Sequence, residues 1–190
     1  MREERRVGRP RSASRELLAE AACELFLEKG FAATSVADIT QRAGVSRNTF
    51  FNYIPTKSDL LWTSVDDALE QLAAELAGPG DDAVAEVRAA LLRVAAGIEP
   101  GTVALAFANA EPMGVAEELE ESAARRQRRV GGIIAAHLRR RGTADLVAEV
   151  VGAALAGAFL AALRAWARSP VPRPPLPDVL TEALAVVRLG

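Results

Sequence analysis

Eight residues near the start of the chain, Ser46 to Tyr53, include side chains suited to hydrogen bonding with nucleic-acid bases. Arg47 carries a guanidinium that can donate two parallel hydrogen bonds to guanine O6 and N7. Asn48 and Asn52 carry amides of the kind that pair with adenine, and Phe51 offers an apolar ring to a thymine methyl group or a sugar. We therefore expect base contacts from Arg47, Asn48, Phe51 and Asn52. The alternatives are a phosphate or solvent role for Arg47 and water-mediated or absent contacts for the two asparagines.

A second set of side chains is suited to phosphate contacts, which position a protein on DNA without selecting a sequence. Its members are Thr34, Ser35, Ser46, Thr49, Tyr53 and Lys57. Lys57 begins a predicted helix, where a cation opposes the helix dipole, so a phosphate partner would explain its presence. The alternative for Lys57 is an ordinary solvated lysine. Phe50 is assigned to the core.

The scaffold for these residues is predicted to be a helix-turn-helix within residues 14–56. The sequence Ala43-Gly44-Val45-Ser46 joins two helical patterns, because glycine supplies a turn and Ser46 can cap the next helix. The first helix is expected from Ser14 to about Lys29. A short helix follows after Thr34 or Ser35, and the third runs from 47 to about 54. A second helix that opens on polar and basic residues is typical of one that enters a DNA major groove.

The rest of the chain, residues 57–190, shows helical periodicity and no alternating strand pattern. Helices are expected at about 57–77, 82–96, 102–110, 115–141, 143–168 and 178–189. The predicted fold class is all-α, with an N-terminal three-helix helix-turn-helix domain fused to a C-terminal helical bundle that dimerises. Four arginines, at 125, 126, 128 and 129, follow a run of glutamates and are predicted to form a solvated, ion-paired face.

The helix at 143–168 is apolar on every side between 150 and 163, so it must be buried all round. Either it is the middle helix of the chain's own bundle, or one of its faces meets a symmetric partner. Small residues at i+4 spacing would allow close approach, and the last helix could join a four-helix interface. The predicted dimer contacts are Ala153, Gly157, Ala161, Leu180 and Leu184.

The chain has 190 residues and a net charge of −2, which by itself argues against a nucleic-acid binder. The charge is unevenly distributed, since residues 1–57 carry +3 and residues 58–190 carry −5. A local basic surface matters more than the sum over the chain.

Residues 1–13 are expected to form a flexible basic arm, in which Arg9 and Arg11 are candidates for minor-groove insertion. The alternative is a disordered solubilising tail.

A cytoplasmic location is expected from cysteine usage and from the apolar runs. The one cysteine, Cys23, rules out an intramolecular disulfide and fits a reducing compartment. The longest uncharged apolar run, 150–163, is shorter than the ~18 residues that indicate a membrane span. No signal peptide is visible, so we expect no membrane contact.

Little in the chain suggests catalysis. A cysteine–histidine dyad would have to join Cys23 to His137 across two domains, and no GxSxG, phosphate-binding glycine loop or HExxH motif occurs. No set of histidines and cysteines could hold zinc. We expect no enzyme, no catalytic residue, no metal and no cofactor; an all-α enzyme that uses only carboxylates is the remaining enzymatic alternative.

A block of residues resembles the DNA-binding domain of TetR-type (tetracycline-repressor-like) bacterial regulators. It consists of Gly30-Phe31, Thr34-Ser35-Val36, Ile39, Ala43 to Tyr53, and Lys57. The resemblance covers about residues 14–61. Two departures are Thr40, where alanine is common, and Ile54, where an aromatic residue is common; neither is expected to contact DNA.

The resemblance implies a homodimer whose two third helices enter successive major grooves of a palindromic operator on double-stranded DNA. It implies a repressor released when a small molecule enters the C-terminal domain. The ligand is expected to be hydrophobic, and the predicted pocket residues are Trp62, Phe107, Met113, His137, Phe159 and Trp166. Each of these could instead belong to the plain core. The alternative function is a DNA-binding adaptor controlled by a protein partner; an apolar cavity would favour the ligand-responsive regulator, and a bundle without one the adaptor.

Overall fold

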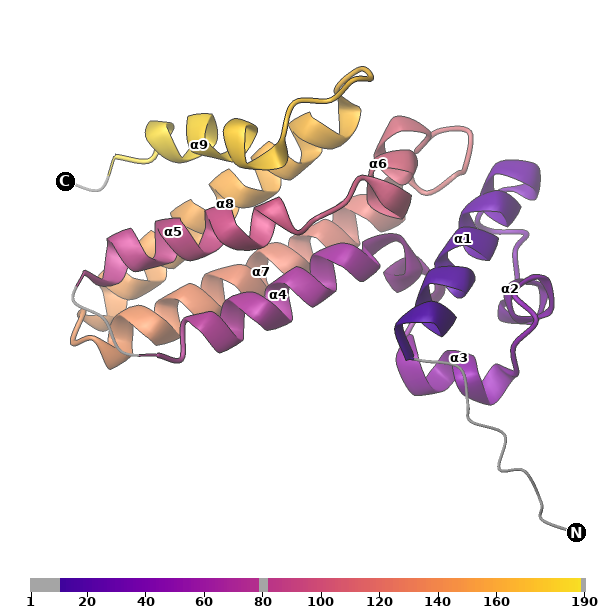
Figure 1. Cartoon of the computed structure of the whole chain (residues 1–190), viewed down its shortest axis with the longest axis horizontal. Helices are drawn as coiled ribbons and strands as arrows, with labels where there is room; N and C mark the ends of the chain where they lie inside the picture. Colours follow the sequence, from indigo (N-terminus) through magenta and orange to yellow (C-terminus); the bar gives the residue numbers. More distant parts are fainter. Residues whose placement is uncertain (1–10, 79–81, 189–190) are drawn as a thin grey trace, which may run out of the picture.

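The computed structural model describes residues 11–78 and 82–188, and this described part contains helices and loops but no β-strand. Three helices at one end, α1 (Arg11–Lys29), α2 (Val36–Arg42) and α3 (Arg47–Tyr53), stand against an elongated helical bundle (Figure 1). The bundle contains the 3-10 helix η1 (Lys57–Trp62) and helices α4 (Thr63–Glu75), α5 (Ala83–Ala96), α6 (Gly101–Ala108), α7 (Ala116–Arg140), α8 (Asp145–Arg168) and α9 (Leu176–Val186). The predicted all-α architecture is confirmed.

The three-helix group has its own apolar centre, built from periodic positions of α1. Leu18, Ala22 and Phe26 are fully buried, as are Ile39 of α2 and Phe50 of α3. Helix α1 begins at residue 11, so the prediction that it begins at Ser14 is wrong. Arginine and alanine, which flank the two serines here, favour helix and extend it toward the N-terminus.

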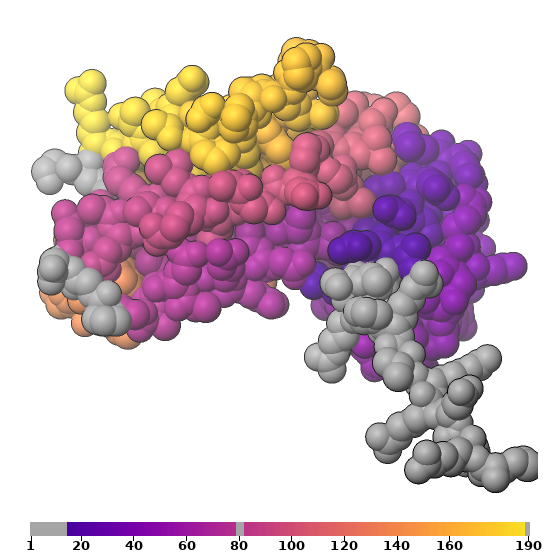
Figure 2. Space-filling model, in the orientation of Figure 1, coloured from indigo at the N-terminus to yellow at the C-terminus, as the bar shows by residue number. Residues whose placement is uncertain are grey.

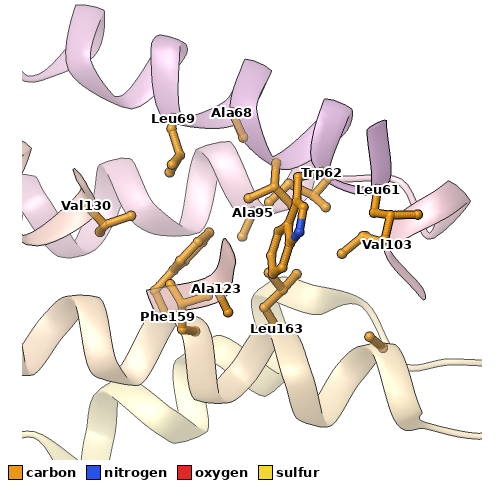
Figure 3. Close-up of a cluster of buried hydrophobic side chains, with 14 of the residues drawn as sticks. Leu61, Trp62, Ala68, Leu69, Ala95, Val103, Ala123, Val130, Phe159 and Leu163 are labelled. Atoms are coloured by element: carbon orange, nitrogen blue, oxygen red, sulfur yellow. The ribbon is translucent and has the colours of Figure 1, made fainter. Parts of the chain in front are cut away.

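The helix predicted at 57–77 is interrupted. Residues Lys57–Trp62 form a 3-10 helix that begins with a capping box between Thr56 and Asp59, and the α-helix starts only at Thr63. The side chain of Trp62, at the junction, is fully buried between α4, α7 and α8, and Figure 3 shows it beside Leu163 and Val103. The interruption lets Asp59 and Trp62 both turn toward α7.

Helices α7 and α8 form the closest pair in the bundle. Gly131 and Gly152 face each other so closely that a Cβ on Gly152 would lie 2.6 Å from the Gly131 carbonyl oxygen. One side of α8 is buried by α6, α7 and α9. The other side is open, with Leu146 and Val150 exposed by 76% and 59%. Of the two alternatives for α8, burial on every side within its own chain is therefore excluded, and one of its faces stays open.

Helix α9 packs on α8 and α5 and covers one edge of the bundle (Figure 2). Its Leu180 and Leu184 are 0% and 3% exposed, so they belong to the core of the chain. Their assignment to a dimer surface is wrong, because the side of α9 that carries them turns inward. Arg88 of α5 holds the end of α9 by donating to the carbonyls of Leu184 and Val187, at 2.9 and 2.7 Å.

Helix α8 is long and apolar enough to cross a membrane if only length and composition are considered. The central helix of a water-soluble bundle satisfies the same two criteria, and 56% of the most apolar stretch of α8 is buried inside the fold. The feature is therefore accounted for by packing against α6, α7 and α9.

Candidate nucleic-acid interface

The helix-turn-helix made by α2 and α3 is fixed by three local interactions. Ser35 caps α2 and forms a reciprocal capping box with Asp38. Gly44 adopts φ of 65°, a left-handed conformation that glycine reaches without steric cost. Ser46 then caps α3 by accepting a hydrogen bond from the backbone N–H of Thr49 at 3.1 Å. The geometry of the predicted helix-turn-helix therefore follows from short-range interactions that are visible in the sequence.

The outer face of α3 carries the four predicted base-contacting residues. Arg47, Asn48 and Asn52 are exposed, and Phe51 is 63% exposed. None of the three polar side chains has a hydrogen bond or an ion pair within residues 11–78 and 82–188. Phe50, one residue before Phe51, is fully buried as predicted. The helix thus presents unpaired donors and acceptors together with an exposed aromatic ring.

The predicted phosphate-contacting residues are placed unequally. Ser35, Ser46 and Thr49 lie at helix N-termini on the accessible side, where backbone N–H groups also point outward. Tyr53 is half-buried and packs against the core. Thr34 is 2% exposed, and its hydroxyl donates to the Gly30 carbonyl at 2.8 Å. The prediction for Thr34 is therefore wrong, because its hydroxyl is used to close the loop between α1 and α2.

Lys57 is explained by internal contacts. Its Nζ donates to the backbone carbonyls of Phe31 and Thr34, at 2.6 and 3.0 Å, and lies 3.9 Å from the centre of the Phe31 ring. Burial lowers the pKa of the Lys57 ammonium from its ordinary value. The cation at this helix start therefore ties the loop after α1 to η1, and no phosphate is needed to account for it.

The two arginines predicted for the minor groove fall at the edge of the structure. Arg9 lies outside the described residues. Arg11 is the first residue of α1, so its backbone is helical and does not belong to an extended arm. The predicted arm, residues 1–13, therefore extends too far, because residues 11–13 belong to α1.

Ion pairs cover the outer side of α1 and α2. Arg42 pairs with Glu24 and donates two hydrogen bonds to Glu28, and Lys29 pairs with Asp38 at 2.8 Å. Hydrogen bonds from Lys29 and from Ser35 hold the pKa of the Asp38 carboxyl well below its usual range. Charges on this side are matched within the chain, which leaves Arg47 on α3 as a cation open to an outside partner.

The six residues predicted to line a ligand pocket are all buried, but they do not form one site. Trp62 and Phe107 contact each other edge to face, with ring centres 5.6 Å apart. Phe159 lies in the same apolar cluster (Figure 3). Met113 is at the junction of the two groups of helices, where its carbonyl accepts a hydrogen bond from the Phe31 N–H at 2.8 Å.

The other two members of the set have separate structural roles. His137 contacts the Leu76 carbonyl through Nδ1 at 2.8 Å, at the end of α4 distant from α3 (Figure 1). Trp166 donates from its indole nitrogen to the carbonyl of Pro174 at 3.0 Å and anchors the proline-rich segment before α9. The prediction that the six residues line one pocket is therefore wrong, since Phe107 alone among them lines either of the two described hollows.

Two hollows can be described in the structure, and both are open to solvent. The larger, of about 720 Å³, lies between α1 and α4 and is closed at the back by the corner between α5 and α6. Glu16, Glu20 and Glu99 are among its lining residues. The smaller, of about 400 Å³, lies beside Phe107 and Arg168. Within the described residues no cluster of three or more metal-ligating side chains is present.

The predicted solvated arginine face on α7 contains an exception. Arg125, Arg128 and Arg129 are exposed, but Arg126 is only 5% exposed and is paired with Asp59 and Asp66. The two aspartates are seven residues apart, across the junction between η1 and α4. Their spacing is the one signal in the sequence that could have indicated a shared cationic partner.

Comparisons with known proteins agree with the geometry of α2 and α3. Residues 18–62 match the bacterial regulatory proteins of the tetR family, and residues 81–190, more than half of the chain, match the MftR C-terminal domain. The putative mycofactocin biosynthesis transcriptional regulator MftR of Mycobacterium tuberculosis is 40% identical over 72 residues, which are 38% of this chain and 36% of that protein. The HTH-type transcriptional regulator EthR of the same species is 41% identical over 68 residues, 35% of this chain and 32% of EthR. The alignments thus span only a minor part of either curated relative.

Solved structures extend the similarity to the whole chain. Thermus thermophilus FadR, a TetR family transcriptional repressor in complex with lauroyl-CoA, is 29% identical, with a TM-score of 0.52 over 93% of this chain and 97% of FadR. A putative TetR-family regulator from Syntrophomonas wolfei has a TM-score of 0.57 at 16% identity, over 93% of this chain and 94% of that one, and supports the fold alone. The chain belongs to the TetR family of bacterial regulatory proteins.

Proposed function

We propose that this protein is a cytoplasmic transcriptional repressor that binds a palindromic operator as a homodimer and responds to a small apolar ligand. The observation that carries the proposal is the outer face of α3, where Arg47, Asn48, Phe51 and Asn52 are exposed on a helix fixed by a capped turn. A guanidinium and two amides without partners in the described part of the chain offer the donors and acceptors that base edges require.

The homodimer is supported by the open side of α8. Leu146, Val150, Ala153 and Ala161 are exposed, and Gly157 between them is half-buried. Their spacing places them along one face of the helix, where small residues allow a second α8 to approach closely. A partner bound there would cover apolar surface and would set the separation of the two α3 helices. We expect Ala161→Arg to give monomers in light scattering, whereas Glu70→Arg, at an exposed position of α4, leaves the dimer intact.

A small apolar ligand is supported by the similarity to FadR, which is described in complex with lauroyl-CoA. In this chain Trp62, Phe107 and Phe159 lie in a closely packed apolar cluster. A ligand with an acyl chain would have to displace side chains there to make space for itself. Such repacking offers a physical route to repression release, since packed cores change between discrete arrangements instead of deforming continuously.

The adaptor controlled by a protein partner is the second candidate function, and the packed cluster favours it. Both described hollows are open to solvent, and neither is lined by Trp62 or Phe159. A protein partner would bind an outer surface and would require no space within the bundle.

The primary test is fluorescence anisotropy of the purified protein on DNA fragments from its own upstream region, measured over a salt series. We expect tight binding to one palindromic fragment, with an affinity that falls as salt rises because phosphate contacts release counterions. Arg47→Ala should weaken binding to that fragment more than to unrelated DNA. Equal, weak binding to all fragments would contradict sequence-specific recognition.

The ligand test uses lauroyl-CoA, with coenzyme A as the control that lacks the acyl chain. We expect lauroyl-CoA to release the operator fragment and to raise the melting temperature of the free protein, while coenzyme A does neither. A ligand shifts the population away from DNA only by its difference in affinity for the two states. Operator release by neither compound, together with capture of a stoichiometric protein partner that does release it, would favour the adaptor.

A further inference from the structure

A buried ion cluster joins the long helix α7 to the segment that follows the recognition helix. At its centre the guanidinium of Arg126 donates to both carboxylate oxygens of Asp66, from Nε at 2.9 Å and from Nη2 at 2.5 Å. Nη2 also donates to Asp59 at 3.1 Å. Asp59 belongs to η1 and Asp66 to α4, so one side chain of α7 holds both parts of the interrupted helix together.

The cluster reaches the DNA-binding domain through Asp59. The second oxygen of this carboxylate accepts hydrogen bonds from the backbone N–H of Thr56 at 3.2 Å and from its hydroxyl at 2.7 Å. Thr56 comes three residues after the end of α3, and Lys57 next to it is bonded to the carbonyls of Phe31 and Thr34. Hydrogen bonds, together with the peptide bond between Thr56 and Lys57, therefore link α7 to both ends of the helix-turn-helix.

On the other side, the cluster is anchored in the apolar core. The guanidinium carbon of Arg126 lies 4.7 Å from the centre of the Trp62 ring, a cation–π contact. The indole nitrogen of Trp62 donates to the Ser122 hydroxyl at 2.8 Å, and Arg126 Nη1 donates to the Ser122 carbonyl at 3.3 Å. Trp62 and Ser122 are 0% exposed. The guanidinium is therefore fixed in direction as well as in position.

Buried ion clusters of this kind are an inefficient source of stability, because charges lose hydration when they are buried and apolar residues of similar volume often stabilise as well or better. What the cluster provides is a fixed orientation of η1 and α4 relative to α7, because the planar guanidinium of an arginine bonds two carboxylates only in one arrangement. Arg125 and Arg129, which also approach the two aspartates, stay at 4.0 and 3.9 Å and are exposed. Arg126 alone among these arginines makes the short contacts.

We propose that Arg126 is the positioning residue of the DNA-binding domain: by bonding Asp59 and Asp66 together it fixes the angle at which the helix-turn-helix leaves the bundle. This inference rests on the proposed DNA-binding function. Two recognition helices of a dimer must match half-sites about 34–36 Å apart, or a multiple of this distance. If the angle at the Asp59–Asp66 junction is not held, α3 of each subunit samples positions that do not fit the operator, and DNA affinity falls although the helices remain folded.

The decisive variant removes every charge of the cluster at once and combines Arg126→Met, Asp59→Asn and Asp66→Asn. It leaves no uncompensated charge in the core, so it is expected to unfold cooperatively at the wild-type temperature or above. We expect its operator affinity to fall at least about tenfold, an effect equal to ~1.4 kcal/mol. Arg126→Lys keeps the charge but loses the fork, so it should bind the operator with intermediate affinity.

Arg139→Met is the matched control. Arg139 lies on the same helix as Arg126, and its ion pairs with Asp145 and Glu149 are exposed. The Arg139→Met variant should therefore bind the operator with wild-type affinity. A neutral variant that folds and binds the operator with wild-type affinity would overturn the proposal. If the neutral variant does not fold, Arg126→Lys decides: wild-type operator affinity in that variant would overturn the proposal as well.

A measurement without DNA separates this proposal from the proposed function. Spin labels on the exposed positions Gln41 of α2 and Arg128 of α7, in a Cys23→Ala chain diluted with unlabelled protein, report the distance between the two domains of one subunit. We expect one narrow distance distribution in the wild type and a broad one in the neutral variant. Equal distributions would overturn the positioning role, whereas failure of the wild type to bind any DNA would overturn only the proposed function.

Discussion

Arg47 and Arg126 are both arginines on helices, and they end in opposite situations. Arg47, on α3, is exposed and has no partner within the described residues. Arg126, on α7, is 5% exposed and bonds to Asp59, to both oxygens of Asp66 and to the Ser122 carbonyl. A polar side chain without partners on a rigid helix is available to another molecule, whereas one whose donors are satisfied inside the chain organises the fold.

The same contrast separates Phe50 and Phe51, which are neighbours in sequence. Phe50 is fully buried and Phe51 is 63% exposed, although their rings touch edge to face at 5.3 Å. Phe51 is exposed on α3 together with Arg47 and Asn52, so its ring is placed for the predicted apolar contact with a thymine methyl group or a sugar. The two regions can therefore be tested by asking which substitutions change folding and which change binding.

The largest expected effect is on folding, at the buried arginine. Arg126→Met leaves Asp59 and Asp66 facing each other without their cation, and breaking a buried pair in this way costs about 3–5 kcal/mol. Urea unfolding should show this loss in the free energy of unfolding. Arg139→Met, where the lost pairs are exposed, should cost no more than about 1 kcal/mol. Equal effects of the two substitutions would remove the distinction between a buried and a solvated cluster.

The two phenylalanines should separate folding from binding. Phe50→Ala leaves a cavity between the three N-terminal helices and should destabilise the protein by about 3–5 kcal/mol, as measured by thermal or urea unfolding. Phe51→Ala should change the free energy of unfolding by less than ~0.5 kcal/mol but weaken operator binding. If Phe51→Ala instead destabilised the fold as much as Phe50→Ala, the exposed ring would belong to the core.

A smaller effect is expected at Arg47, and it should appear only in binding. Arg47→Ala is expected to cost about 1–3 kcal/mol of operator affinity and to relax selectivity at one base pair, because the bidentate contact is lost. Thermal unfolding should be unchanged. Anisotropy titrations on the operator and on variants with single base changes provide the measurement. A uniform loss across all sequences, with a smaller dependence on salt, would identify Arg47 as a phosphate contact instead.

Much of the local structure could be predicted from the sequence because it is fixed by short-range interactions. Ser46 as a cap, Gly44 in the turn and the apolar spacing of α1 each act within a few residues, and the helix-turn-helix follows from them. Thr34 shows the limit of this reasoning. A hydroxyl beside a helix N-terminus suggests a phosphate contact, but this one turns inward to the Gly30 carbonyl.

The wrong predictions for residues of the bundle have another cause, because they depend on which face of a helix turns inward. Leu180 and Leu184 fit an interface by spacing alone, but α9 folds back on α5 and α8 and buries them. Large side chains such as His137 and Trp166 suggested a pocket, although they are 61 and 8 residues away from the carbonyls they contact. Such contacts are set by the tertiary arrangement, and no periodicity in the sequence specifies them.

The smallest expected effects concern two aspartates, one in each region, whose pKa values should shift in opposite directions. Hydrogen bonds from Lys29 and Ser35 hold the pKa of Asp38 below its usual 3.8, so its stabilising contribution is present above that value and is lost as pH falls through the folded-state pKa. Burial raises the pKa of Asp66 above 3.8, more than Arg126 lowers it, so its ionised form costs stability above the raised pKa. Acidification should therefore lower the free energy of unfolding through Asp38 and raise it through Asp66. Carboxyl carbon NMR titration should place the pKa of Asp66 above 3.8 and that of Asp38 below it; a pKa of Asp66 below 3.8 would mean that the charge of Arg126 outweighs burial, and the cluster would then favour the ionised form as the ion pairs on α1 and α2 do.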